Sequence, residues 1–225
     1  MYKICFAFLS ALFFFVIGIS TADAQQVPLS VTEFRQLYDS LLSDKTLVSE
    51  TKEGSAVIRK ERRFYPPMET GDGEFEIPIT VTVTETVDGK PVQKTSIDIF
   101  DRVHDLGGQV LIYEEYKRTT VERPDEGTRT TKEVEFGGLF RVARNEKGGF
   151  DVHTFGLMPS VLVEGDSMSI AGTMGQYSCF PEKGITKCVL TIRDYKLGDY
   201  EPLVGYKLAE PAGGDFVEVT EEVRK

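Results

Sequence analysis

Apolar side chains recur at the spacing of an α-helix early in the chain. The members of this stripe are Val31, Phe34, Leu37, Tyr38, Leu41 and Leu42. Ser30 and Glu33 occupy the two positions of a capping box, and Leu29 and Phe34 those of a hydrophobic staple. The pattern predicts an amphipathic helix over about residues 31–43. Such a stripe is typical of core packing, with a ligand-binding or partner-binding face as the alternative.

A pattern of period two follows the helix. Its apolar positions alternate mainly with Glu and Thr, and they are Phe75, Ile77, Ile79, Val81 and Val83. This alternation predicts a strand with one buried face and one wet face. Pro78 has no backbone N–H, so we expect the strand to lie at an edge or to carry a bulge there. Asp88–Gly89 predicts a tight hairpin turn, with a return strand over residues 92–100.

The rest of the chain repeats this organisation of short strands between polar turns. The expected strands cover residues 109–121, 128–136, 139–144, 150–157, 161–163, 174–180, 185–195, 203–209 and 216–221. No linker or fixed-period repeat interrupts them. The spacing predicts an all-β domain in which an antiparallel meander forms a barrel or a sandwich. Periodicity does not encode strand order, so both architectures stay open.

A helix followed by a β meander resembles the layout of the calycins, the group that includes the lipocalins. The resemblance concerns the order of the elements alone. The Gly-x-Trp motif of lipocalins is absent, because the chain contains no Trp. The layout implies a fold and leaves the function undetermined.

Residues 1–24 have the features of a secretory signal peptide. Lys3 precedes an apolar run that reaches Ile19, and Ala22–Asp23–Ala24 provides a small-x-small cleavage site. The run is shorter than the roughly 20 residues needed to cross a bilayer. We therefore expect cleavage after Ala24 and a periplasmic or secreted protein. Residues 25–225 would form a single β-rich domain without an integral membrane span.

The composition narrows the range of partners. The formal net charge is -10, and cleavage leaves it unchanged because Lys3 and Asp23 depart together. An acidic protein is a poor partner for nucleic acid, whose phosphates repel it. The same charge favours a soluble monomer.

Two cysteines remain after the signal peptide, Cys179 and Cys188. An even pair in an exported chain predicts a disulfide. If Lys183–Gly184 forms a two-residue turn, the cysteines lie directly opposite each other, within bridging distance. A redox pair is the alternative, but such pairs usually have the spacing Cys-x-x-Cys.

No sequence motif indicates catalysis, a metal or a cofactor. Gly165–Asp166–Ser167 matches a short esterase string, but no His follows it in the chain. Asp98, Asp101, His104 and Asp105 lack the ligand pattern of a calcium loop, and we interpret them as a solvated strand end. We therefore predict no catalytic residue, no metal site and no cofactor.

Two further groups of charged residues are considered as candidate sites, an acidic pair and a basic run. Glu114 and Glu115 are adjacent, so on a strand they face opposite sides and cannot act together on one substrate. The basic run at residues 59–63 is interpreted as the polar face of a strand, with a local anion-binding patch as the alternative.

The segment from Phe155 to Tyr177 contains only two charged residues, Glu164 and Asp166. Methionine is flexible and often lines adaptable apolar pockets. The candidate ligand-binding residues are Phe155, Leu157, Met158, Met168, Met174 and Tyr177. Ordinary interior strands are the alternative interpretation of this segment.

The function predicted from the sequence is non-enzymatic binding of a small apolar or amphipathic ligand. A cell-envelope interaction or structural protein with a filled core is the alternative, and an unrecognised hydrolase comes third. A large apolar cavity would favour the first, and a broad exposed apolar patch the second.

Overall fold

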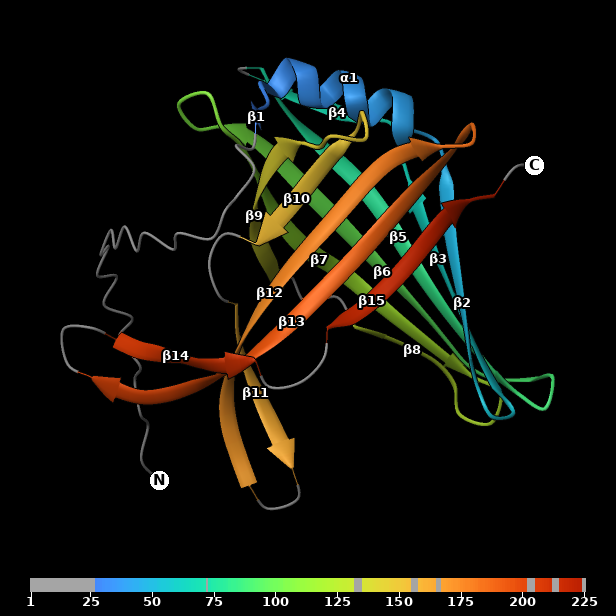
Figure 1. Ribbon diagram of the computed structural model, residues 1–225. Helices are drawn as coiled ribbons and strands as arrows, with labels where there is room; N and C mark the ends of the chain where they lie inside the picture. The colour runs from blue at the N-terminus through green and yellow to red at the C-terminus, as the bar shows by residue number, and fades with distance from the viewer. Residues whose placement is uncertain are drawn as a thin grey trace, which may run out of the picture.

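The protein is a closed antiparallel β-barrel of ten strands with one short helix across one end (Figure 1). The computed structural model describes residues 27–71, 73–131, 135–154, 158–164, 167–201, 205–211 and 215–223. The predicted all-β class with a single helix is confirmed, and the architecture is a barrel rather than a sandwich. The predicted signal peptide lies outside the described residues.

Ten strands form the ring, and antiparallel pairing joins each to the next. In spatial order they are β9 (Glu135–Arg144), β10 (Phe150–Thr154), β12 (Ser167–Glu182), β13 (Ile185–Glu201), β15 (Phe216–Glu222), β2 (Thr46–Glu53), β3 (Ala56–Phe64), β5 (Glu74–Val87), β6 (Lys90–Asp105) and β7 (Val110–Arg123). The ring closes where β7 pairs with β9.

Five shorter strands pair with members of this ring. They are β1 (Val27–Pro28) beside β9, β4 (Met68–Gly71) beside β5, β8 (Gly127–Thr131) beside β7, β11 (Met158–Glu164) beside β12 and β14 (Gly205–Pro211) beside β13. In Figure 1, β11 and β14 lie away from the end that the helix covers.

The helix α1 (Val31–Leu41) begins with the predicted capping box. The Ser30 hydroxyl accepts a hydrogen bond from the Glu33 N–H at 3.2 Å, and the Ser30 N–H donates to the Glu33 carboxylate at 3.0 Å. The apolar stripe faces the barrel, where Phe34, Tyr38 and Leu41 are buried. No helix among the described residues is long and apolar enough to cross a membrane.

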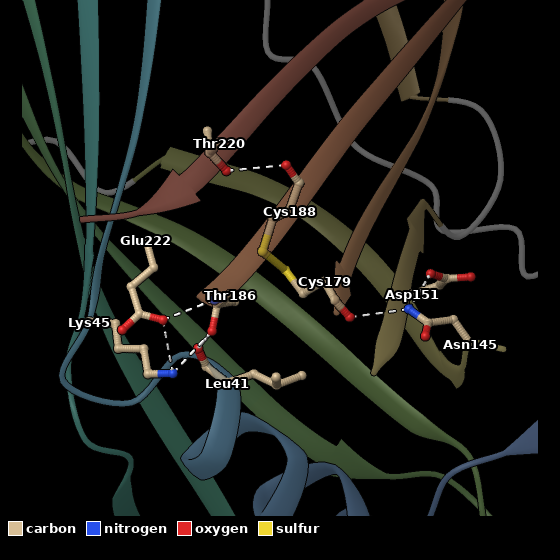
Figure 2. The surroundings of a disulfide bond; sticks show 9 residues. All are labelled: Leu41, Lys45, Asn145, Asp151, Cys179, Thr186, Cys188, Thr220 and Glu222. Carbon is tan, nitrogen blue, oxygen red and sulfur yellow. Dashed lines mark hydrogen bonds and ion pairs between the residues drawn. A yellow bond between two sulfur atoms is a disulfide. The ribbon is translucent and has the colours of Figure 1, made fainter. Parts of the chain in front are cut away.

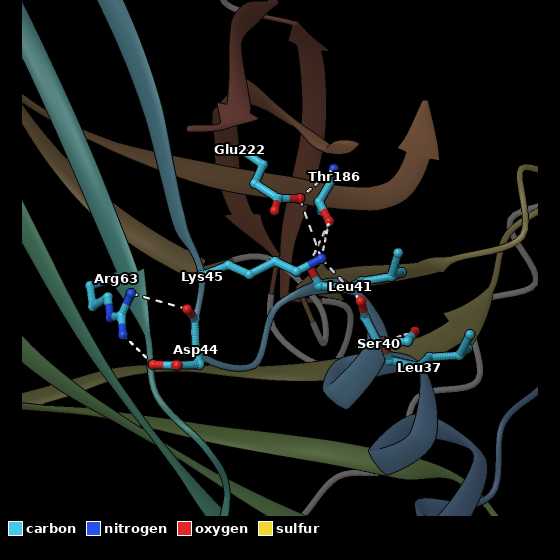
Figure 3. Close-up of polar contacts among 8 residues, drawn as sticks. All are labelled: Leu37, Ser40, Leu41, Asp44, Lys45, Arg63, Thr186 and Glu222. Carbon is cyan, nitrogen blue, oxygen red and sulfur yellow. Dashed lines mark hydrogen bonds and ion pairs between the residues drawn. The ribbon is translucent and has the colours of Figure 1, made fainter. Parts of the chain in front are cut away.

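Side chains from the barrel hold the C-terminal end of α1 (Figure 3). The Thr186 hydroxyl donates to the Leu41 carbonyl at 2.6 Å, and Lys45 Nζ donates to the Ser40 carbonyl at 3.0 Å. These bonds satisfy carbonyls that a helix end leaves without partners. Lys45 also pairs with Glu222 at 3.3 Å. Burial opposes the charge of Glu222, but the Thr186 N–H and Lys45 outweigh it and lower its pKa.

Both predicted two-residue turns are present. Asp88 and Gly89 have φ values of 50° and 75°, and Lys183 and Gly184 have 52° and 80°. Positive φ at both central residues is the requirement of a type I′ turn, whose twist matches that of the flanking strands.

The second of these turns aligns the cysteines. Cys179 lies directly opposite Cys188, and a disulfide joins them with a Cα–Cα distance of 4.2 Å (Figure 2). Both residues are 0% exposed. The predicted disulfide is confirmed. It joins the neighbouring strands β12 and β13, and both cysteines belong to the hydrophobic core.

The prediction for Pro78 was wrong. β5 has neighbours on both sides, and Pro78 pairs in regular register with Phe100. The Pro78 carbonyl accepts a hydrogen bond from the Tyr65 N–H at 3.1 Å. In an antiparallel strand the N–H and C=O of one residue point to the same side. The absent N–H would therefore face the connection between β3 and β4, where no strand needs a donor.

The disulfide generates the first testable prediction. Replacing Cys179 with Ser removes a cross-link that contributes about 2–3 kcal/mol by the chain-entropy argument. We expect the variant to melt at a lower temperature than the wild type in oxidising buffer. The measurement is thermal unfolding followed by circular dichroism, with fully reduced wild-type protein as the control. Equal melting temperatures of the variant and the oxidised wild type would contradict a stabilising bridge.

Candidate binding site

A cavity of about 260 Å³ lies inside the barrel, directly below α1. Phe34, Tyr38 and Leu42 form its ceiling. The walls are mainly apolar side chains from the inner face of the ring, and they are Phe64, Ile77, Ile79, Ile99, Ile112, Phe140, Phe150, Val152, Leu190 and Ile192. These positions alternate with outward-facing ones along each strand, as expected in a barrel.

Three charged side chains also line this apolar cavity. Arg62 comes from β3, Asp101 from β6 and Glu114 from β7. Asp101 and Glu114 lie directly opposite each other on paired strands, which brings two carboxyl groups together on the inner face. The Arg62 guanidinium lies over the ring of Tyr177, 4.8 Å from the ring centre. The name interior cluster is used below for Arg62, Asp101, Glu114, Tyr116 and Tyr177.

The interpretation of residues 59–63 as a polar strand face was wrong for Arg62. Arg62 shares its face of β3 with Phe64, which is buried. Arg59 and Glu61 lie on the other face and form an ion pair at 2.8 Å. β3 carries charges on both faces, so its sequence does not reveal which face is inside.

The interpretation of Asp101 as part of a solvated strand end was also wrong. Asp101 lies between Ile99 and Val103 on the inner face of β6, and both neighbours are buried. Arg102 lies on the outer face, where it pairs with Glu76 at 3.2 Å. The prediction that Glu114 and Glu115 face opposite sides agrees with the structure, because Glu115 pairs with Arg102 outside the barrel at 3.3 Å.

Burial changes the protonation of the two carboxyl groups. Desolvation raises the pKa of Asp101 well above its usual range, the charge of Glu114 raises it further, and Arg62 lowers it. Desolvation also raises the pKa of Glu114, against the opposing effects of Tyr116 and Arg62. Two adjacent carboxylates in an apolar interior disfavour simultaneous ionisation. The pair therefore titrates as a unit and retains one proton to a higher pH than an exposed carboxyl group would.

Gly137 provides the space that Glu114 occupies. Glu114 pairs with Gly138 and Glu115 with Phe136, so Gly137 is the extra residue of a β-bulge in β9. A Cβ atom at residue 137 would lie 2.5 Å from Glu114 Oε1. Any side chain at this position would therefore displace the carboxyl group.

Two buried polar atoms of the cluster have no hydrogen-bond partner within the described part of the chain. They are Asp101 Oδ1 and the Tyr177 hydroxyl. An unsatisfied buried polar group costs on the order of 1–3 kcal/mol. A molecule in the cavity that offered hydrogen bonds to these atoms would remove that cost.

Of the six predicted ligand-binding residues, Tyr177 lines the cavity. Met174 has 39% of its surface exposed. The backbones of Met158 and Met168 lie in the β11–β12 pairing, and their side chains lie outside the described part of the structure. Phe155 and Leu157 lie outside the described residues.

Sequence analysis missed Arg62, Asp101 and Glu114 as site residues. The sequence does contain a signal for the two acidic residues. Each occupies a position where the alternating pattern of its strand predicts a buried apolar residue. Asp101 falls between Ile99 and Val103, and Glu114 between Ile112 and Tyr116. A charge at a core phase of a strand is costly unless it is paired or functional.

Within the described residues, no group of three His, Cys, Asp or Glu side chains is arranged to hold a metal ion. Comparison of the chain with protein-family models, with curated proteins and with solved structures gives no match.

The raised pKa of Asp101 predicts a dependence of stability on pH. The folded state binds a proton that the unfolded chain has released above about pH 4. The free energy of unfolding should therefore fall as pH rises from about 4 toward the folded pKa, by up to about 1.4 kcal/mol per pH unit. Asp101→Asn should flatten this slope, as measured by urea denaturation across pH. Asp98→Asn makes the same charge change outside the barrel and is the control. Identical slopes for Asp101→Asn and the wild type would contradict the buried acid.

The bulge at Gly137 predicts an energetic coupling with Glu114. Gly137→Ala should destabilise the barrel by about 1–3 kcal/mol, because the added methyl group overpacks the cluster. In a Glu114→Ala background the same substitution should cost much less, since the obstructing carboxyl group is gone. A double-mutant cycle by chemical denaturation measures this coupling. Additive effects of the two substitutions would show that Glu114 does not fill this space.

Proposed function

We propose that this barrel binds a small amphipathic molecule in its interior and does not transform it chemically. The observation that carries the proposal is the cavity below α1, with apolar walls and one localised group of charged and hydroxyl-bearing side chains. Ligand sites commonly combine an apolar lining with a few convergent polar groups that fix orientation.

The size and polarity of the cavity support a small ligand. Its volume of about 260 Å³ is just below the roughly 300–1,000 Å³ common for drug-sized ligands. Apolar atoms of the ligand would contact the isoleucine and phenylalanine side chains of the wall. Its polar end would face Arg62, Asp101 and Glu114. The Asp101 Oδ1 atom and the Tyr177 hydroxyl nearby have no hydrogen-bond partner among the described residues.

We further propose that the protein works in the periplasm or outside the cell, as a soluble monomer. The signal-peptide features of residues 1–24 support export. The buried disulfide belongs to the class of bonds that form in oxidising compartments. The outer face of β6 and β7 carries ion pairs that suit contact with water, such as those of Arg102 with Glu76 and Glu115.

A contact with another envelope protein is the second candidate function. The outer face of β15 exposes Val217 and Val219, and Val223 is exposed just beyond the end of the strand. These residues are the feature that a protein partner would cover. A photo-crosslinking residue at position 217 would capture such a partner in cells, whereas one at position 118, exposed on the outer face of β7, would not.

Native mass spectrometry tests the ligand-binding proposal. Protein purified from the periplasm should carry an extra mass that denaturing solvent extraction removes. Leu190→Trp places a large ring in the cavity and should abolish the extra mass. Val189→Trp, on the outer face of the same strand, should retain it. An unliganded mass for the wild type, with no small molecule recovered by extraction, would count against the proposal.

A further inference from the structure

The described side chains that line the cavity include more acidic than basic groups. Lys60 lies on the same face of β3 as Arg62, and its ammonium group pairs with Glu218 of β15 at 2.9 Å. This pair accounts for one charge of each sign. Among the described residues that line the cavity, Arg62 then remains as the one cation, and it faces two carboxyl groups, Asp101 and Glu114.

Without a ligand, this cluster is neutral only when the two carboxyl groups share one proton. The other titratable groups that face them are tyrosine hydroxyls, from Tyr38 of α1, Tyr116 of β7 and Tyr177 of β12. Burial raises the pKa of Tyr38 and of Tyr116, so their hydroxyls stay neutral. The charge balance of the cavity therefore depends on a proton that a cation could replace.

The cluster also contains a hydrogen-bond acceptor that is not satisfied. Asp101 Oδ1 is a buried acceptor without a donor among the described residues. The guanidinium of Arg62 lies over the Tyr177 ring, 4.8 Å from the ring centre. An ammonium group offers three donors and one positive charge in a compact volume.

We infer that the ligand of this cavity is a lipophilic amine, whose ammonium group binds between Asp101 and Glu114 and whose apolar part fills the space below α1. This inference rests on the proposed function and specifies the class of ligand. Arrival of the ammonium ion allows both carboxyl groups to ionise, and the shared proton leaves to solvent. The cluster then holds two positive and two negative charges and stays neutral.

Other ligand chemistries would change the proton count differently. A neutral alcohol leaves the shared proton in place. A carboxylate adds a third acidic group beside one arginine, so it would enter together with a proton from solvent. The number and direction of protons exchanged on binding therefore distinguish the three classes.

The experiment is isothermal titration calorimetry of the mature protein with octylamine, octanol and octanoate. Each titration is made in phosphate and in HEPES at the same neutral pH, and the difference in observed heat gives the protons exchanged. We expect octylamine to bind at least about tenfold more tightly than octanol, equivalent to about 1.4 kcal/mol, and to release about one proton. Octanoate should bind more weakly than octanol.

Variants connect this preference to the cluster. Asp101→Asn and Glu114→Gln should each lower the affinity for octylamine at least about tenfold and leave the affinity for octanol nearly unchanged. Glu115→Gln removes an adjacent carboxylate from the outer face and should change neither. Retained binding of octanol shows that a variant is folded. If one of the two variants fails to fold, the other still tests the inference.

The outcomes separate the inference from the proposed function. Tighter binding of octanoate than of octylamine, or octylamine binding without proton release, would overturn the amine assignment and leave the binding cavity in place. If none of the three compounds bound, or if Leu190→Trp did not weaken their binding, both the inference and the interior binding site would fall.

Discussion

The pairing of β7 with β9 closes the ring of strands, and the properties of the interior depend on this closure. A closed ring leaves no sheet edge along its circumference and separates an inner face from an outer one. Every second side chain of the wall then faces the interior. Isoleucine and phenylalanine gain stability from that position, whereas Arg62, Asp101 and Glu114 are stable there only as a mutually compensating group.

The helix completes the enclosure by packing aromatic rings against the barrel. Phe34 contacts Phe75 and Phe150, with ring centres 6.1 Å and 5.1 Å apart. The Tyr38 hydroxyl donates to the Tyr65 carbonyl at 2.8 Å. At the other side of the helix, Thr186 and Lys45 fix its last carbonyls to the strands. The ceiling of the cavity is therefore held by apolar packing and by hydrogen bonds at the same time.

Local signals in the sequence predicted α1, both type I′ turns and the disulfide, because each is determined by a few adjacent residues. The closure of the barrel was not predictable in this way. The alternation of apolar and polar residues in β7 and β9 does not specify that these two strands pair. The inward direction of Arg62 was hidden because β3 is charged on both faces. Asp101 and Glu114 become neighbours only through the register of β6 and β7. Pro78 was misjudged because its tolerance depends on a third segment, the connection between β3 and β4.

Neighbouring strands of the ring differ in the extent of their backbone pairing. β15 and β2 share only two backbone pairs, Glu221 with Val48 and Glu222 with Leu47, the fewest between any neighbouring strands of the ring among the described residues. The polar contacts of Glu218 with Lys60 and Ser49 cross this seam from β15 to β3 and β2. Local opening follows the lowest local stability, so the wall separates most readily where the last strand of the ring meets the first. We therefore expect backbone amides on either side of this seam to exchange with solvent faster than those elsewhere in the ring.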